Sequence, residues 1–157
     1  FAVNFFAPFM LTRAFARQLC GKTKEAYEQG QDEQGCVINI LDNKIAFQQN
    51  SYAAYLLSKK TLAEFTRLSA IEFAPSLRVN GIAPGVVMPG DNRTEDYINW
   101  RVEGIPLKKQ GAVSELILAM NYLLSNDFVT GQILTVDGGE SLNSVGLNAE
   151  LYRKKDQ

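Results

Sequence analysis

The sequence predicts an α/β fold in which helices cover both faces of a doubly wound parallel sheet. Three short apolar runs have the character of buried strands, and a helical pattern precedes each of them. This alternation of helix and strand implies right-handed crossovers between parallel strands. A length of 157 residues suits one domain.

The first elements are an apolar helical pattern and a strand. Residues 1–15 carry the helical pattern, in which Pro8 indicates a first-turn position or a kink. Residues 21–35 are polar, and we expect them on the surface. Cys36–Leu41 is a nearly continuous apolar run and is predicted to be the first strand. No initiator Met, signal peptide or strand precedes the helical pattern, which indicates a cut through a larger protein.

The second helix is predicted from about Ser51 to Phe73, with Pro75 closing it. Apolar side chains occupy most of its circumference. We therefore expect it to pack on the sheet and also on a second surface, such as another subunit. The second strand is predicted at Leu77–Ala83.

The last third of the chain is predicted to hold an irregular segment, a helix and a strand. The irregular segment runs from Pro84 to about Gln110, and within it Asp91–Gly104 is predicted to be either a mobile substrate lid or a solvated loop. A helix at Val113–Ser125 leads to the third strand, Gln132–Val136. The polar tail, 144–157, is either a solvated end or an oligomer arm.

Composition argues against several classes of function. The net charge is −1 and there is no long basic block, so we expect no binding to nucleic acid or to anionic membranes. No apolar run reaches the roughly 20 residues of a membrane span. The chain has no histidine and two cysteines, which argues against a metal site and a His-based triad. The cysteines are expected to be reduced thiols in a cytoplasmic protein.

Acid–base chemistry is predicted at Tyr55 and Lys59, which lie four residues apart on one helix face. A nearby ammonium favours the phenolate, so we expect Lys59 to lower the pKa of Tyr55 towards the range useful for proton transfer. Asp42 follows the first strand, thirteen residues before Tyr55. Because ligands bind beyond the carboxyl ends of parallel strands, the three side chains are predicted to share one rim. The alternative for Asp42 is a cap or turn residue.

Taken together, these motifs resemble the C-terminal half of a short-chain dehydrogenase/reductase. The matching segments are Asn4, Val37–Ile40, Tyr55–Lys59, Arg78–Gly85 and Thr130–Gly139. The resemblance implies the C-terminal part of a Rossmann-like sheet over residues 1–143, followed by the tail at 144–157. The family's glycine-rich phosphate loop does not occur in these 157 residues. We therefore expect the fragment alone to be inactive and to bind a nicotinamide cofactor poorly.

The resemblance implies catalytic roles for three residues. In that family a Tyr donates a proton, and this role falls on Tyr55. The family's Lys binds the nicotinamide ribose and lowers the pKa of the Tyr, a role that falls on Lys59. An Asn helps to order a proton-relay water, and here it is Asn4.

The resemblance also implies contacts with cofactor and substrate. Besides Tyr55 and Lys59, the residues expected to border the cofactor are Ile40, Pro84, Gly85 and Val87, and the backbone of Val87 is expected to meet the carboxamide. Val86 is expected to contact the substrate together with Asp42 and Tyr55. A Thr common in the family is replaced by Pro89, which removes one expected phosphate contact.

The main departure from the family is Asp42, where the family usually has Ser. A carboxylate would repel the developing oxyanion of an alcohol–ketone reaction. A protonated Asp42 could donate to a ring nitrogen during C=N reduction, and an ionised one could anchor an amino-substituted heterocycle. This exchange resembles the pteridine reductase branch, as do Pro89 and the tyrosines Tyr52 and Tyr55. The resemblance implies NADPH-dependent reduction of a pterin or dihydropterin-like substrate, with NADH as the other candidate cofactor.

Two other functions stay open at this point. The first is a general carbonyl or acyl-carrier-protein ketoreductase, in which Asp42 is a local peculiarity. The second is a catalytically silent fragment or oligomerisation module. Tyr52 and Lys59 also form a Tyr-x6-Lys pattern like that of enoyl reductases, but packing or substrate stacking is the favoured role for Tyr52. The resemblance further implies a homodimer or homotetramer that pairs through helices near residues 4–19 and 52–73.

Overall fold

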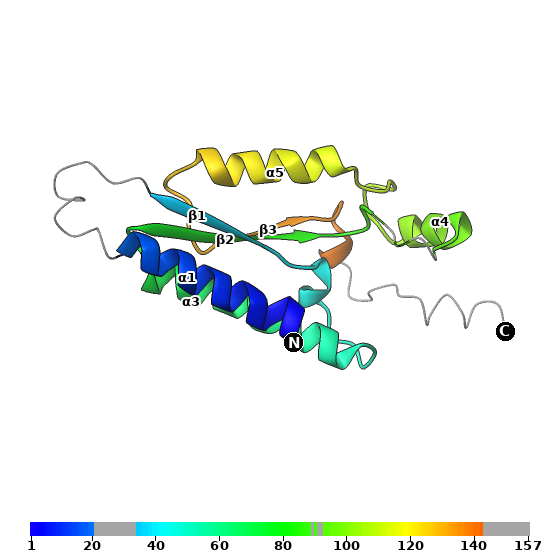
Figure 1. Cartoon of the computed structure of the whole chain (residues 1–157). Helices are drawn as coiled ribbons and strands as arrows, with labels where there is room; N and C mark the ends of the chain where they lie inside the picture. The colour runs from blue at the N-terminus through cyan, green and yellow to red at the C-terminus, as the bar shows by residue number, and fades with distance from the viewer. Residues whose placement is uncertain (21–33, 89, 91–92, 143–157) are drawn as a thin grey trace.

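The computed structural model describes residues 1–20, 34–88, 90 and 93–142. Its centre is a parallel sheet with the strand order β1-β2-β3. The strands are β1 (Gly35–Ile40), β2 (Leu77–Pro84) and β3 (Ile133–Val136). Helices α1 (Ala7–Cys20) and α3 (Ala53–Glu72) cover one face of this sheet, and α5 (Val113–Ser125) covers the other (Figure 1). The predicted doubly wound parallel arrangement is confirmed.

Strand β2 is the central strand and fixes the register of its neighbours. Val79 pairs with Val37 of β1, and Gly81 pairs with Ile133 of β3. Because all three strands are parallel, their carboxyl ends meet at one edge of the sheet. Within the part of the chain that the structure describes, the other edge of β1 pairs with no strand.

The face beneath α1 and α3 is closed by two apolar clusters. One cluster contains Ala16, Ala70, Leu77 and Val79, and the other contains Leu41, Leu62, Ala63 and Ala83. Removing a leucine or valine side chain from water contributes about 1.5–3 kcal/mol. This burial holds α3 against the sheet and so fixes the helix that carries Tyr55 and Lys59.

The opposite face is closed by α5, through Ile82, Ala119 and Leu123. Arg78 is buried here, and its guanidinium donates to the carbonyls of Leu123 and Leu124 at 2.8 and 3.1 Å. These carbonyls belong to the last turn of α5, whose backbone acceptors have no partners within the helix. Arg78, a residue of a family-like motif, therefore joins the end of α5 to the central strand.

Helix α3 also presents apolar side chains to solvent. Leu57, Leu68 and Ile71 are exposed, whereas Leu56 and Leu62 of the same helix are buried. The predicted packing on the sheet is confirmed, and the exposed side chains leave an apolar surface for a second contact.

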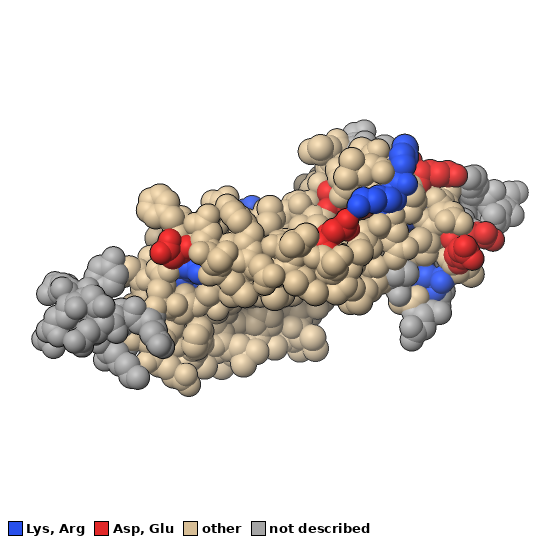
Figure 2. Space-filling model, turned by 90° about the horizontal axis from the view of Figure 1, so that it is seen from above, with Lys and Arg blue, Asp and Glu red and all other residues tan. Residues whose placement is uncertain are grey.

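Figure 2 shows the opposite face of the molecule, over α5, where most side chains are uncharged.

One predicted segment differs from the structure. Within the stretch predicted to be irregular, Glu95–Glu103 forms helix α4, so the solvated-loop alternative is wrong for these residues, while the substrate-lid alternative stays a prediction. The Thr94 hydroxyl accepts from the Tyr97 N–H at 3.2 Å, and Glu95 and Asp96 lie in the positive first turn. Capping and first-turn charge thus start a helix whose apolar pattern alone is weak.

Some predictions concern residues outside the described ranges. These are the surface segment up to residue 33, the departure at Pro89, the start of the lid segment at Asp91, and the tail at 144–157. At the start of the chain, the predicted helix divides into a π-helix, η1 (Ala2–Phe6), and α1, with Pro8 in the first turn of α1. Among the helices of the described ranges, none is both long and apolar enough to cross a bilayer.

Candidate active site

The site begins where β1 ends. Asp42 has an extended backbone and caps a short 3-10 helix, η2 (Asn43–Ala46), since one of its oxygens accepts from the Lys44 N–H at 2.8 Å. Its other oxygen accepts from the Tyr55 hydroxyl at 2.5 Å. Asp42 therefore serves both as a cap and as the partner of the phenol. The two side chains are in contact, as the sequence predicted.

The environment of Tyr55 makes its phenol a weaker acid. Partial burial raises the pKa of Tyr55, and the hydrogen bond to Asp42 and the negative charge of that carboxylate raise it further. A neighbouring carboxylate disfavours the phenolate because it repels a second negative charge. The sequence prediction that Lys59 lowers the pKa of Tyr55 is therefore wrong for this structure.

Lys59 is directed to the end of β1. Its ammonium donates to the carbonyl of Ile40 at 2.9 Å. Burial lowers the pKa of Lys59, and the Asp42 carboxylate opposes part of that shift. The i, i+4 pair shares a helix, as predicted, but burial and the hydrogen-bonded carboxylate of Asp42, rather than the ammonium, determine the acidity of Tyr55.

Asn4 lies on η1 and contacts α3 one residue before Lys59. Its amide donates to the Ser58 hydroxyl at 3.3 Å, and that hydroxyl donates to the Tyr55 carbonyl at 2.6 Å. π-helical turns within helices are often found at functional sites. The structure places Asn4 beside the backbone of Tyr55 and makes no contact between it and the phenol or Asp42.

Two cavities divide the predicted site residues. The first, of about 440 Å³, is lined by Asp42, Tyr55, Gly85, Val86 and Val87, together with residues of η2 and α4. The second, of about 600 Å³, is lined by Asn4, Ile40 and Lys59 among others.

The two cavities separate the predicted residues by role only in part. Asp42, Tyr55 and Val86, which are predicted to meet substrate, line the first cavity, and so do Gly85 and Val87, which are predicted to border the cofactor. Lys59 and Asn4, which are predicted to meet the ribose and a relay water, line the second. Pro84 ends β2 and lines neither cavity.

One wall of the first cavity comes from the segment for which a substrate lid was one prediction, although its helical structure was not predicted. Arg93, Tyr97, Ile98 and Arg101, from α4 and the segment before it, line it opposite η2. The Arg93 guanidinium stacks over the Tyr97 ring with 4.8 Å from its carbon to the ring centroid. The sequence pattern from which this helix could have been predicted is the Thr94 cap followed by Glu95 and Asp96.

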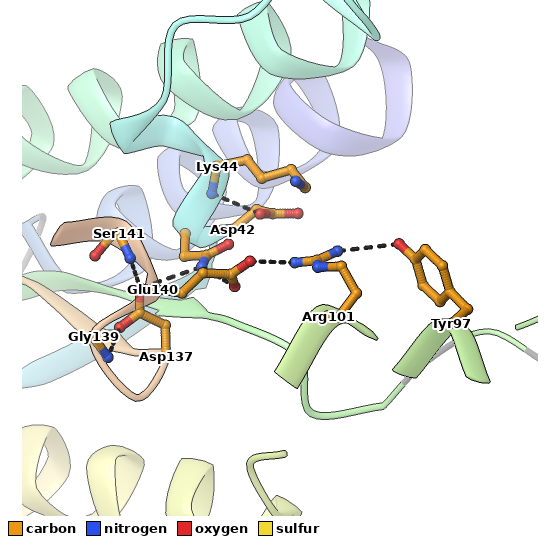
Figure 3. A network of polar contacts seen from close by, with 9 residues as sticks. Asp42, Lys44, Tyr97, Arg101, Asp137, Gly139, Glu140 and Ser141 are labelled. Atoms are coloured by element: carbon orange, nitrogen blue, oxygen red, sulfur yellow. Dashed lines mark hydrogen bonds and ion pairs between the residues drawn. The ribbon is translucent and has the colours of Figure 1, made fainter. Parts of the chain in front are cut away.

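A buried polar network underlies the same cavity (Figure 3). Arg101 donates to Glu140 at 2.6 Å and to the Tyr97 hydroxyl at 3.2 Å. The amide of Asn43 donates to Glu140 at 2.8 Å and to Asp137 at 3.2 Å. No sequence motif pointed to Arg101, Glu140 or Asn43, because their pairing joins segments up to 97 residues apart.

Asp137 organises the turn after β3. Burial alone would raise the pKa of its carboxyl, but hydrogen bonds from Ser141, Asn43 and the Gly139 N–H together hold the pKa below its ordinary value. An ionised Asp137 therefore fixes the glycine turn and the start of η3 (Glu140–Leu142) beneath the cavity.

A metal centre is not supported. In the ranges that the structure describes, no group of three or more His, Cys, Asp or Glu side chains is arranged to hold a metal ion. What the site offers is a phenol, a carboxylate and an ammonium within one strand-end region, which is a set suited to proton transfer.

Comparison with known proteins places this arrangement in a family. The family model described as enoyl-(acyl carrier protein) reductase matches residues 1–141. The dihydromonapterin reductase of Citrobacter koseri is 30% identical over 135 residues, which are 86% of this chain and 53% of that protein. The chain thus spans about half the length of the curated relatives it matches.

Two solved structures show the same fold. FolM alternative dihydrofolate reductase 1 from Brucella suis, in complex with NADP, has a TM-score of 0.79 and 28% identity, over 90% of this chain and 53% of that one. A 4-hydroxyisoleucine dehydrogenase complexed with NADH has a TM-score of 0.74 and 30% identity, over 90% of this chain and 57% of that one. The chain therefore belongs to the short-chain dehydrogenase/reductase family.

Proposed function

We propose that the whole protein is a nicotinamide-dependent reductase whose substrate is a pterin or dihydropterin-like heterocycle. The observation that carries this proposal is the hydrogen bond from the Tyr55 hydroxyl to Asp42 at 2.5 Å, on the wall of the first cavity. The similarity to a dihydromonapterin reductase and to FolM alternative dihydrofolate reductase 1 supports the same substrate class.

The pairing of Asp42 with Tyr55 suits a nitrogen-containing substrate. An ionised Asp42 is an acceptor only, so it can bind the amino group and ring N–H of an aminopyrimidine edge by charge-assisted hydrogen bonds. The same charge would oppose the oxyanion that develops in ketone reduction. Tyr55, whose hydroxyl stays protonated beside the carboxylate, holds a proton at the same point of the cavity.

The donor groups also fit a nicotinamide nucleotide. Lys59 has three N–H donors, one of which binds the Ile40 carbonyl, and an ammonium suits the hydroxyls of a ribose. We propose that Lys59, Tyr55, Ile40, Pro84, Gly85 and Val87 hold NADPH, with NADH as the alternative, and that Asn4 orders a relay water. When bound, the cofactor would supply the hydride.

In that scheme Asp42 orients the ring and Tyr55 delivers the proton that follows the hydride, directly or through Asp42. Proton transfer by a positioned side chain contributes roughly 10²- to 10⁴-fold to a rate. Val86 contributes apolar contact to the same wall of the first cavity.

The test compares two substrates in the whole protein, a dihydropterin and an acetoacetyl thioester. We expect Asp42→Ser to lower kcat/KM for the dihydropterin by roughly tenfold or more, because a charge-assisted pair is lost, and to spare or improve reduction of the thioester. Steady-state rates for both substrates measure this.

Two further variants serve as controls. Tyr55→Phe removes the proton donor and should slow both substrates by roughly 10²- to 10⁴-fold, while Asp127→Ser, at an exposed position after α5 that does not line the first cavity, should change neither. Improved pterin reduction by Asp42→Ser would overturn the substrate assignment and favour the general ketoreductase.

We also propose a homodimer or homotetramer. The exposed apolar side chains of α3 (Leu57, Leu68 and Ile71) and those of α5 (Ile117, Leu118 and Leu124) lie on opposite faces of the sheet. Exposed apolar patches mark interaction sites, and we propose that these side chains belong to two of them. One such face makes a dimer, and both together make a tetramer. A cytoplasmic location is part of the proposal and agrees with the free thiol of Cys36.

A further inference from the structure

The first cavity has two walls of different origin. Asp42 and η2 follow β1 and form one wall, and α4 forms the other through Tyr97, Ile98 and Arg101. The width of the cavity therefore depends on how α4 is held relative to the loop that carries Asp42.

A single carboxylate contacts both walls. One oxygen of Glu140 accepts from Arg101 of α4 at 2.6 Å, and the other accepts from Asn43, the residue after Asp42, at 2.8 Å. Figure 3 shows Glu140 between Arg101 and the Asp42 segment. The two N–H donors of the Asn43 amide are directed to Glu140 and Asp137, so η2 is held from two sides.

This ion pair is buried, which bears on its role. The side chains of Arg101 and Glu140 are 8% and 2% exposed. A buried ion pair adds little net stability compared with well-packed apolar residues, because both charges lose their hydration. Its two-sided hydrogen bonding instead defines where α4 and η2 lie, since each bond has a preferred length and direction.

We propose that Glu140 is a positioning residue that fixes α4, through Arg101, against the loop that carries Asp42. Its effect on substrate rests on the proposed function, but its effect on α4 does not. Trp100, the one tryptophan among these 157 residues, precedes Arg101 on α4 and reports on that helix directly.

The test uses the whole protein with Glu140→Gln, and Glu64→Gln as the matched control. Glu64 forms an exposed ion pair with Arg67 on α3, far in the fold from the α4 wall. A Trp100→Phe variant assigns the fluorescence signal. Because Gln cannot accept from both Arg101 and Asn43 in the same way, we expect Glu140→Gln to increase acrylamide quenching of Trp100 and Glu64→Gln to leave it unchanged.

Kinetics provide the second measurement. We expect Glu140→Gln to lower kcat/KM for the dihydropterin roughly tenfold or more, mainly through KM, since small displacements of a binding wall are costly. NADPH affinity should change much less than the KM for the dihydropterin, because Lys59 and Ile40 line the other cavity and, of the residues proposed for the cofactor, only Tyr55, Gly85 and Val87 line this one. A purely structural role would weaken both ligands together.

A companion variant covers the case in which Glu140→Gln fails to fold because Arg101 is left as an uncompensated buried charge. Arg101→Met/Glu140→Gln removes both charges, and we expect it to fold with the same rise in Trp100 quenching. Wild-type quenching in a folded variant, or a parallel loss of NADPH affinity, would overturn the inference. If the wild-type protein does not reduce a pterin, the proposed function fails, and the Trp100 measurement still decides the role of Glu140.

Discussion

Burial and the pairing with Asp42 together determine the chemistry of Tyr55. Burial is the largest cause that raises the pKa of the phenol, and the hydrogen bond that the Asp42 carboxylate accepts at 2.5 Å and the charge of that carboxylate raise it further. With its pKa raised, the phenol keeps its proton and does not readily form a phenolate. In the proposed function, a substrate that binds Asp42 would therefore change the acidity of Tyr55.

We expect Asp42→Asn to lower the pKa of Tyr55. Asparagine keeps the shape and can still accept the hydrogen bond, but it removes the negative charge that disfavours the phenolate. Ultraviolet difference titration of tyrosinate measures the change. Subtracting the titration curve of a Tyr55→Phe variant isolates the signal of Tyr55 from those of the other tyrosines, of which these 157 residues contain six in all. An unchanged or higher titration midpoint in Asp42→Asn would show that burial alone raises the pKa of Tyr55.

At the scale of single residues, the sequence predicts which side chains meet better than it predicts how their pKa values shift. The spacing of Asp42, Tyr55 and Lys59 was enough to expect a shared rim, because helix and strand periodicity fix which faces meet. The direction of the pKa shift was missed, since it depends on whether the phenol bonds to the carboxylate or lies nearer the ammonium. The Glu140–Asn43 bond spans 97 residues of sequence, and no local pattern encodes it.

At the scale of elements, the loop after β2 is pressed against the turn after β3. A Cβ atom added at Gly85 would lie 2.7 Å from the Cβ and 2.8 Å from the Cα of Asp137. Contacts this short force one of the two loops to move. Gly85 is thus a close-approach residue between two strand ends, in addition to lining the first cavity.

We expect Gly85→Ala to lower the free energy of unfolding by about 1–3 kcal/mol, the usual cost of overpacking. Gly111→Ala is the matched control, because its nearest contact is the end of the Val87 side chain at 3.0 Å, which can shift more easily than backbone. Denaturant unfolding of both variants measures the difference. Equal stabilities would contradict the tight approach of the two loops.

The three strands and helices α3 and α5 were predictable to within a residue or two, whereas α1 extends to Cys20, five residues beyond the predicted helical pattern. Cys36–Leu41 was predicted and β1 is Gly35–Ile40, and the predicted bounds of α5, Val113–Ser125, are those of the structure. Strong apolar periodicity produces such agreement. Helix α4 was missed because its start depends on a cap and first-turn charges, which carry less weight than a hydrophobic pattern.

At the scale of the molecule, β1 is an edge strand in the described part of the chain, with the second cavity beside it. That cavity contains Lys59 and Ile40, which are proposed to meet the cofactor ribose. The 157 residues contain no glycine-rich phosphate loop of the kind that binds a pyrophosphate at a helix N-terminus.

We therefore expect the 157-residue chain by itself to bind NADPH weakly, with no submicromolar affinity, because the residues present contact only the nicotinamide end. Isothermal titration of the isolated chain with NADPH measures this. Submicromolar binding would mean that these residues alone supply a phosphate site. The proposal that they contact only the nicotinamide end of the cofactor would then be wrong.

The two cavity walls are supported by different parts of the fold. Asp42 follows β1, and Tyr55 lies on α3, which packs on the sheet. The facing wall is a nine-residue helix that a buried ion pair links to Glu140. In the proposed enzyme, exchange of that helix would therefore alter which molecule fits the cavity while leaving Asp42 and Tyr55 in place.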